Sequence, residues 1–177
     1  MDLAERQIAI EGQQERLISM RAKFAYEIHL RMTTEERIFV VTGDLGYKMW
    51  DQVKRDFPDR FINVGAAEQV LVGVSVGLAL RGKIPFAYSI TPFLLYRPFE
   101  TIRNYLDHEG IPVRLVGSGR DRDYVHDGFS HWSEEDRRIM AIMDNIQSRW
   151  PEKSDEIPGL VDEMIKNNRP WYINLKR

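Results

Sequence analysis

The sequence predicts an α/β domain with a mostly parallel sheet and helices on both of its faces. Apolar runs of strand length alternate with stretches of helical spacing through almost the whole chain, a pattern typical of α/β folds. The run at Arg37–Thr42 (RIFVVT) is continuously apolar after its first residue, as strands buried on both faces of a parallel sheet are. The chain has 177 residues, so we expect one domain at 20–177, preceded by an N-terminal arm at 1–19.

Strands are expected where a short apolar run is bounded by glycine, proline or polar turn residues. In chain order they are expected at 37–42, 60–64, 83–89, 112–118, 145–149 and 170–176. The turn Gly43–Gly46 carries the chain off the first strand, and Gly65-Ala66-Ala67 leads from the second into a helix.

Helices are expected where apolar residues recur at helical spacing or where end signals occur. They are expected at 20–32, 47–57, from Glu68 onward, and at 98–108, 133–143 and 154–167. Pro98 lies in a first turn, where its missing N–H does no harm, and Ser133 precedes an acidic first turn as an N-cap. Residues 3–18 are expected to form a charged, moderately amphipathic helix, which is either an arm that packs on another chain or a frayed extension.

The composition excludes several classes of function. With a net charge of −2, the chain has no electrostatic reason to bind nucleic acid or an anionic membrane. The uncharged run Gln69–Leu80 is far shorter than the ~20 residues that cross a bilayer. No cysteine is present, which excludes disulfides, thiolate metal sites and a cysteine nucleophile. The charged start lacks the apolar core of a signal peptide, so we expect a cytoplasmic location.

One carboxylate, Glu68, stands where an apolar strand becomes an apolar helix. A buried carboxylate without a partner lowers the free energy of unfolding by several kcal/mol, as an order of magnitude. Glu68 therefore either caps its helix, a position worth about 0.3–1 kcal/mol to an acidic residue, or serves a binding or catalytic role. Gly73 and Gly77 follow one turn apart on the same helix, which indicates either a close approach by another backbone or flat ligand, or a crowded contact within the domain.

Ligands of parallel sheets gather outside the carboxyl ends of the strands. Asp44, Glu68, the segment after Ser89 and the loop after Ser118 are expected to converge there. In the segment after Ser89, Phe93 and Tyr96 either form a surface on which a flat ring can stack or pack as apolar core over the end of the sheet. The loop at 117–133 is long and polar, as functional loops often are. Its His126, Asp127 and His131 are either ligands of a metal ion or groups that hydrogen-bond a polyhydroxylated substrate.

The stretch RFINVGAAEQVLVGVSVGLALRGKIPFAYS resembles the pyrimidine-binding domain of transketolase-type thiamine diphosphate enzymes. The resemblance runs from about Met20 to Arg177 and includes the motifs TGDLG, Ala67-Glu68-Gln69, DGFSH, SEEDRRIMAIM and WYINLKR. It implies the fold of that domain and a transferase that moves a two-carbon ketol unit between sugar phosphates or related sugars.

The resemblance also implies roles for individual residues. Glu68 matches the catalytic glutamate that bonds N1′ of the cofactor's aminopyrimidine, and His131 matches a second catalytic residue that also contacts substrate. The other residues implied to bind the cofactor are Phe93, Tyr96, Ile90 and Asp44, and the other residues implied to bind substrate are Asp127 and Arg97. Ile90 stands where the family often has another aromatic residue, which implies weaker stacking on the cofactor. His126 and Trp132 stand where the family commonly has an acidic residue and glutamine, so the resemblance does not identify the substrate.

The resemblance further implies that this chain carries half of a site. In the family, a Gly-Asp-Gly motif and a downstream asparagine hold the diphosphate through a metal, and Gly43-Asp44-Leu45 is not that motif. The chain ends where the pyrimidine-binding domain would end. We therefore expect a split transketolase, in which a partner chain binds Mg and the diphosphate half of thiamine diphosphate, and this chain forms a homodimer within a hetero-oligomer, with no metal ligand of its own.

Two alternatives stay open. The chain could serve another thiamine diphosphate enzyme, similar to 1-deoxyxylulose-phosphate synthase or a 2-oxo acid dehydrogenase. It could also be a non-catalytic binding or regulatory domain with the same fold.

Overall fold

A computed structural model describes residues 19–177 of the chain. Its centre is a six-stranded sheet in the order β2-β1-β3-β4-β6-β5, and every neighbouring pair is parallel. The strands are β1 (Ile38–Thr42), β2 (Phe61–Asn63), β3 (Ile84–Ile90), β4 (Arg114–Ser118), β5 (Gln147–Arg149) and β6 (Trp171–Leu175). The predicted parallel α/β architecture is confirmed.

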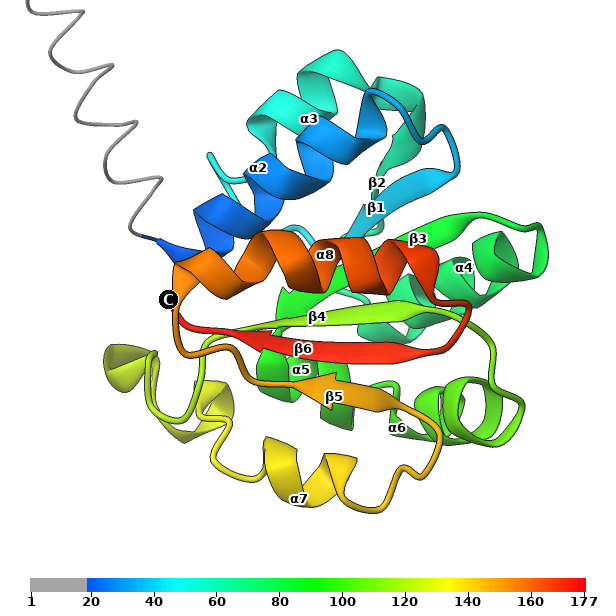
Figure 1. The fold of residues 1–177 in the computed structure, drawn as a ribbon. Coiled ribbons are helices and arrows are strands. Elements are labelled where there is room, and N and C mark those ends of the chain that lie inside the picture. Colours follow the sequence, from blue (N-terminus) through cyan, green and yellow to red (C-terminus); the bar gives the residue numbers. More distant parts are fainter. Residues whose placement is uncertain (1–18) are drawn as a thin grey trace, which may run out of the picture.

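Helices cover both faces of this sheet (Figure 1). One face carries α2 (Met20–Met32), α3 (Asp51–Asp56) and α8 (Ile157–Lys166). The other face carries α4 (Glu68–Leu80), α5 (Thr91–Tyr96), α6 (Phe99–Thr101) with the π-helix η2 (Ile102–His108), and α7 (Asp136–Met140). None of the helices within residues 19–177 combines the length and apolar character needed to cross a membrane.

Alternate residues of each central strand enter different cores, which explains the continuous apolar runs. In β1, Val40 packs beneath α2 and α8, whereas Val41 packs beneath α4. In β3, Phe86 and Ala87 divide in the same way. Successive strand side chains point to opposite faces, so a strand covered on both sides has no polar face to show.

Several boundaries differ from the prediction for local reasons. The helix expected from residue 47 begins at Asp51, because Gly46 and Lys48 hold positive φ angles of 80° and 64° that no α-helix contains. The aromatic segment after Ser89 is not irregular: it forms helix α5, with Pro92 in its first turn. The helix expected at residues 3–18 lies outside the described part of the chain.

Gly73 and Gly77 face outward from α4. A Cβ added at either position would meet no atom within 4 Å, so the prediction of a crowded contact within the domain is wrong. The side chains beside them on this face, Val70 and Leu80, are 51% and 68% exposed. The glycines therefore widen an exposed apolar stripe of α4, defined by Val70, Gly73, Gly77 and Leu80.

Candidate active site

Glu68 is the first residue of α4, and its side chain is only 1% exposed. Its Oε1 accepts a hydrogen bond of 2.9 Å from Ser89 Oγ, at the carboxyl end of β3. Its Oε2 accepts one of 2.5 Å from Nη1 of Arg97, which makes an ion pair. The carboxylate thus turns toward the end of the sheet, and no side chain caps α4. Glu68 therefore makes no capping hydrogen bond, although it is the acidic residue of the first turn of α4.

The turn after β1 closes on the same carboxylate. A Cβ at Gly43 would lie 3.4 Å from Glu68 Oε1 and 3.3 Å from the carbonyl oxygen of Gly65, so this backbone passes close to the glutamate. Asp44 follows with a positive φ of 60° and an exposed side chain. Asn63 fixes it: the Asp44 N–H donates to Asn63 Oδ1 (2.9 Å), and Asn63 Nδ2 donates to the Asp44 carboxylate (3.0 Å).

Helix α5 places an aromatic ring, Phe93, next to the arginine that pairs with Glu68. The guanidinium of Arg97, directly after α5, lies 4.0 Å from the ring centroid of Phe93. The Phe93 ring in turn meets the His131 ring edge to face, with centroids 4.9 Å apart. Four of the residues singled out in the sequence, Glu68, Arg97, Phe93 and His131, are therefore joined by direct contacts.

The remaining predicted residues stand apart from these contacts. Ile90 is the last residue of β3 and is buried. Tyr96 is half exposed, and its hydroxyl donates to Glu135 Oε2 at 3.3 Å, beside the start of α7. Asp127 is exposed in the 3₁₀ turn η3 (Val125–Asp127), which leads into η4 (Phe129–His131). Within residues 19–177 no three His, Asp or Glu side chains gather as metal ligands, so the metal interpretation of His126, Asp127 and His131 gains no support.

The sequence reasoning missed a basic residue beside the loop. Arg21, in the first turn of α2, donates from Nη1 to Tyr124 Oη (3.1 Å) and Ser118 Oγ (3.3 Å). Its buried Nε has no partner, and no carboxylate within residues 19–177 forms an ion pair with it. The Tyr124 ring lies 5.9 Å from the His131 ring. The sequence offered no signal that singled it out, because α2 carries several other charged side chains.

Ser89 was also missed as a functional residue. It was identified only as the end of a strand, although its hydroxyl is fully buried on Glu68. A serine at the end of the largely apolar strand sequence KIPFAYS is a signal of this kind, because buried hydroxyls require partners.

A polar cluster supports the base of the loop. Asp136 is buried, and its Oδ2 accepts hydrogen bonds of 2.7 Å from Trp150 Nε1, Tyr172 Oη and Asn174 Nδ2. Burial, and then the adjacent Asp136, raise the pKa of the Tyr172 hydroxyl well above its ordinary value. The hydroxyl therefore stays protonated and can donate to Asp136 over the physiological range.

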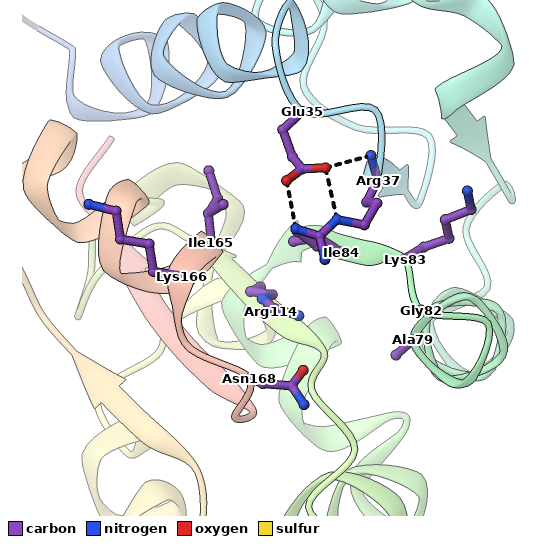
Figure 2. Close-up of a pocket in the computed structure, with 10 residues that line it drawn as sticks. All are labelled: Glu35, Arg37, Ala79, Gly82, Lys83, Ile84, Arg114, Ile165, Lys166 and Asn168. Atoms are coloured by element: carbon purple, nitrogen blue, oxygen red, sulfur yellow. Dashed lines mark hydrogen bonds and ion pairs between the residues drawn. The ribbon is translucent and has the colours of Figure 1, made fainter.

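A cavity of about 440 Å³ lies at the opposite, amino edge of the sheet (Figure 2). At its centre, the Arg114 guanidinium donates to the carbonyl oxygens of Met164, Pro112 and Asn167, around the end of α8. Burial, with the nearby charge of Arg37, lowers the pKa of Arg114 to about 10. Figure 2 shows the ammonium groups of Lys83 and Lys166 turned away from Arg114. Arg114 thus serves to close a helix end, remote from Glu68.

Comparisons with known proteins agree with the fold of the chain. The sequence family described as "Transketolase, pyrimidine binding domain" matches residues 16–177. An apulose-4-phosphate transketolase subunit of Actinobacillus succinogenes is 36% identical over 121 residues, which are 68% of this chain and 39% of that protein. The 6-deoxy-6-sulfo-D-fructose transketolase subunit SqwH of a Clostridium species is 32% identical over 146 residues, which are 81% of this chain and 45% of that protein.

A solved structure described as "Split gene transketolase, inactive beta4 tetramer" has a TM-score of 0.80 and 30% identity. The match covers 90% of this chain and 51% of that one, so the chain spans about half or less of these relatives. The resemblance drawn from the sequence motifs is confirmed. Because the family match extends over residues 16–177, the chain belongs to the transketolase pyrimidine-binding domain family.

Proposed function

We propose that this chain supplies the aminopyrimidine half of a thiamine diphosphate site in a split transketolase. The observation that supports this most is the pairing of buried Glu68 with a flat cation that also lies over the Phe93 ring. The Arg97 guanidinium offers N–H donors along its edge and a planar face. An aminopyrimidine that donates at N1′ presents the same two features. The residues present therefore fit that group.

In this proposal Glu68 accepts the hydrogen bond from the pyrimidine N1′, and Phe93 supports one face of the ring. Ser89 holds the glutamate in place through the hydrogen bond to its other oxygen. The burial of Glu68 keeps water away, which strengthens a hydrogen bond to its carboxylate. Bound thiamine diphosphate would supply the carbanion chemistry by which a two-carbon ketol unit is transferred. We assign supporting cofactor contacts to Tyr96, Ile90 and Asp44, in line with the family resemblance.

The substrate we propose is a sugar phosphate or a related sugar. His131 stands beside Phe93 and can hold or move a proton at a substrate hydroxyl, while Asp127 and Arg97 are exposed where a substrate can reach them. Arg21 favours a substrate that carries a negative charge. The hydrogen-bond partners described for its guanidinium are only hydroxyl groups, so the guanidinium suits a phosphate group. The relatives named above are transketolase subunits for a phosphorylated and a sulfonated sugar.

The diphosphate and its Mg would be held by a partner chain. The described residues gather no set of metal ligands, and the named relatives are subunits rather than whole enzymes. Self-association is proposed along the exposed stripe of α4, whose glycines allow close packing, and the similar solved structure is described as a β4 tetramer. In this proposal the enzyme acts in the cytoplasm, as a homodimer of this chain within a hetero-oligomer.

The first test is to isolate the native complex. The tagged chain is purified from its own cells, and its partner is identified by mass spectrometry. A stoichiometric partner that carries a Gly-Asp-Gly motif and a downstream asparagine is expected. Its absence would leave a binding or regulatory domain as the better account.

The second test uses the reconstituted complex with Glu68→Gln. Ketol transfer from a panel of ketose phosphates is expected to fall by about 10²-fold or more, while assembly is unchanged. Glu100→Gln, at an exposed position of α6, is the matched control and should keep wild-type transfer. Full activity of Glu68→Gln would contradict the assignment. Activity with 2-oxo acids but not with ketoses would instead indicate a synthase or dehydrogenase of the same cofactor class.

A further inference from the structure

The Arg97 guanidinium occupies both contacts that a flat ligand of this site would need. One edge donates to Glu68 Oε2 at 2.5 Å, and the planar group lies 4.0 Å from the Phe93 ring centroid. We propose that Arg97 is an internal placeholder, which fills the aminopyrimidine position in the cofactor-free protein and is displaced when the cofactor binds. This inference rests on the function proposed above.

Arg97 and an aminopyrimidine ring cannot occupy this position at the same time, for geometric reasons. Ser89 already takes Oε1 of Glu68, and the turn at Gly43 approaches that same oxygen. A ring nitrogen must therefore compete with Arg97 for Oε2. The same guanidinium covers a face of Phe93, whose ring also meets His131. A ring cannot stack on a face that the guanidinium covers, so Arg97 must move before a pyrimidine takes that position.

The burial of the two partners is unequal, and this makes the exchange feasible. The Glu68 side chain is 1% exposed, whereas the Arg97 side chain is 46% exposed. In the cofactor-free protein, the guanidinium neutralises a carboxylate that would be costly to leave unpaired. When a ligand replaces it, the long side chain can rotate into water and regain its hydration without movement of the backbone. Glu68 keeps a donor in both states, and only Arg97 changes its surroundings.

A competing interpretation predicts the opposite sign. If Arg97 stayed on Glu68 in the loaded site and positioned it, loss of the guanidinium would weaken cofactor binding. If Arg97 is a placeholder, its loss removes a competitor. The apparent dissociation constant equals the intrinsic one divided by the fraction of open sites. An arginine that closes the site about 90–99% of the time would therefore weaken binding about 10- to 100-fold.

The test is calorimetric titration of thiamine diphosphate and Mg into the cofactor-free complex. Arg97→Gln is expected to lower the Kd by about 10- to 100-fold, and Arg97→Lys, which keeps the charge but cannot stack as a plane, to lower it less. The Tm of the cofactor-free Arg97→Gln complex should fall, while the Tm of the saturated complex should match wild type. Arg103→Gln, an exposed arginine in η2 that bonds its neighbour Asn104, is the control and should change neither.

An unchanged or higher Kd in both Arg97 variants would overturn the placeholder. Glu68→Gln in the same titration separates this failure from that of the proposed function. If wild type binds the cofactor and Glu68→Gln binds it more weakly, the site is correct and only the placeholder fails. If the wild-type complex binds no thiamine diphosphate, both proposals fail together.

Discussion

Ser89→Ala tests how much of the stability of the chain depends on the glutamate pocket. The Ser89 side chain is 0% exposed, and its hydroxyl donates to Glu68 Oε1 at 2.9 Å. A hydrogen bond to a charged group contributes about 1.5–3 kcal/mol net, and its loss here leaves a buried carboxylate oxygen without a donor. We expect the free energy of unfolding to fall by about 1.5–3 kcal/mol. For a domain of this size, about 2 kcal/mol corresponds to a fall in Tm of about 4–8 °C.

Ser75→Ala provides the matched control. Ser75 is also 0% exposed, but its hydroxyl donates to Leu71 O, four residues back in α4. That carbonyl also accepts the helical N–H bond, and alanine is the better helix former, so we expect a change within about 0.5 kcal/mol. Urea unfolding of the cofactor-free chain, followed by circular dichroism, measures both variants. A Ser89→Ala loss no larger than that of Ser75→Ala would refute the reasoning that Glu68 depends on this donor.

Two further predictions concern the loop and its support. Gly119→Ala should destabilise the chain by at least about 1–3 kcal/mol, because the φ of Gly119 is +84° and a Cβ would overlap the Tyr124 ring. The control is Gly159→Ala in α8, where an added Cβ meets nothing within 4 Å. In the same urea assay it should stabilise the chain by about 0.5–1 kcal/mol. The raised pKa of Tyr172 contributes stability that is complete below the pKa of about 10 of an unfolded tyrosine and is lost as the pH rises above it. Melting temperatures measured between about pH 8 and 11 should therefore fall less steeply with pH for Tyr172→Phe than for wild type, and parallel curves would contradict the role of this hydroxyl.

The sequence was sufficient to predict the six strands and most of the helices, because these elements carry their own local signals. Continuous apolar strands such as RIFVVT and the helical spacing of Met20–Met32 need no knowledge of distant residues. Helix α5 was missed although Pro92 marks its first turn. Its apolar residues run almost all round, so the segment shows none of the one-sided periodicity by which a surface helix is found.

The contacts within the site could not be predicted in the same way. Glu68 and Arg97 are 29 residues apart, and they meet at the carboxyl end of β3, which α4 precedes and α5 follows. Strand and helix alternation does not determine strand order. Family resemblance could assign roles to Glu68 and Arg97 separately, but it did not indicate that the two side chains pair in the cofactor-free protein.

The central position of β3 also explains why the site is built on the connection from this strand to α5. Thr91, the first residue of α5, donates from Oγ1 to the carbonyl oxygen of Gly119 at 2.9 Å, just beyond β4. A Cβ at Gly117 would lie 2.6 Å from that hydroxyl oxygen, so glycine is required for this close approach. The start of α5 is thereby tied to β4 on one side, while Ser89 before it is tied to Glu68 on the other. Phe93 and Arg97 lie two and six residues beyond Thr91, so their positions depend on both attachments.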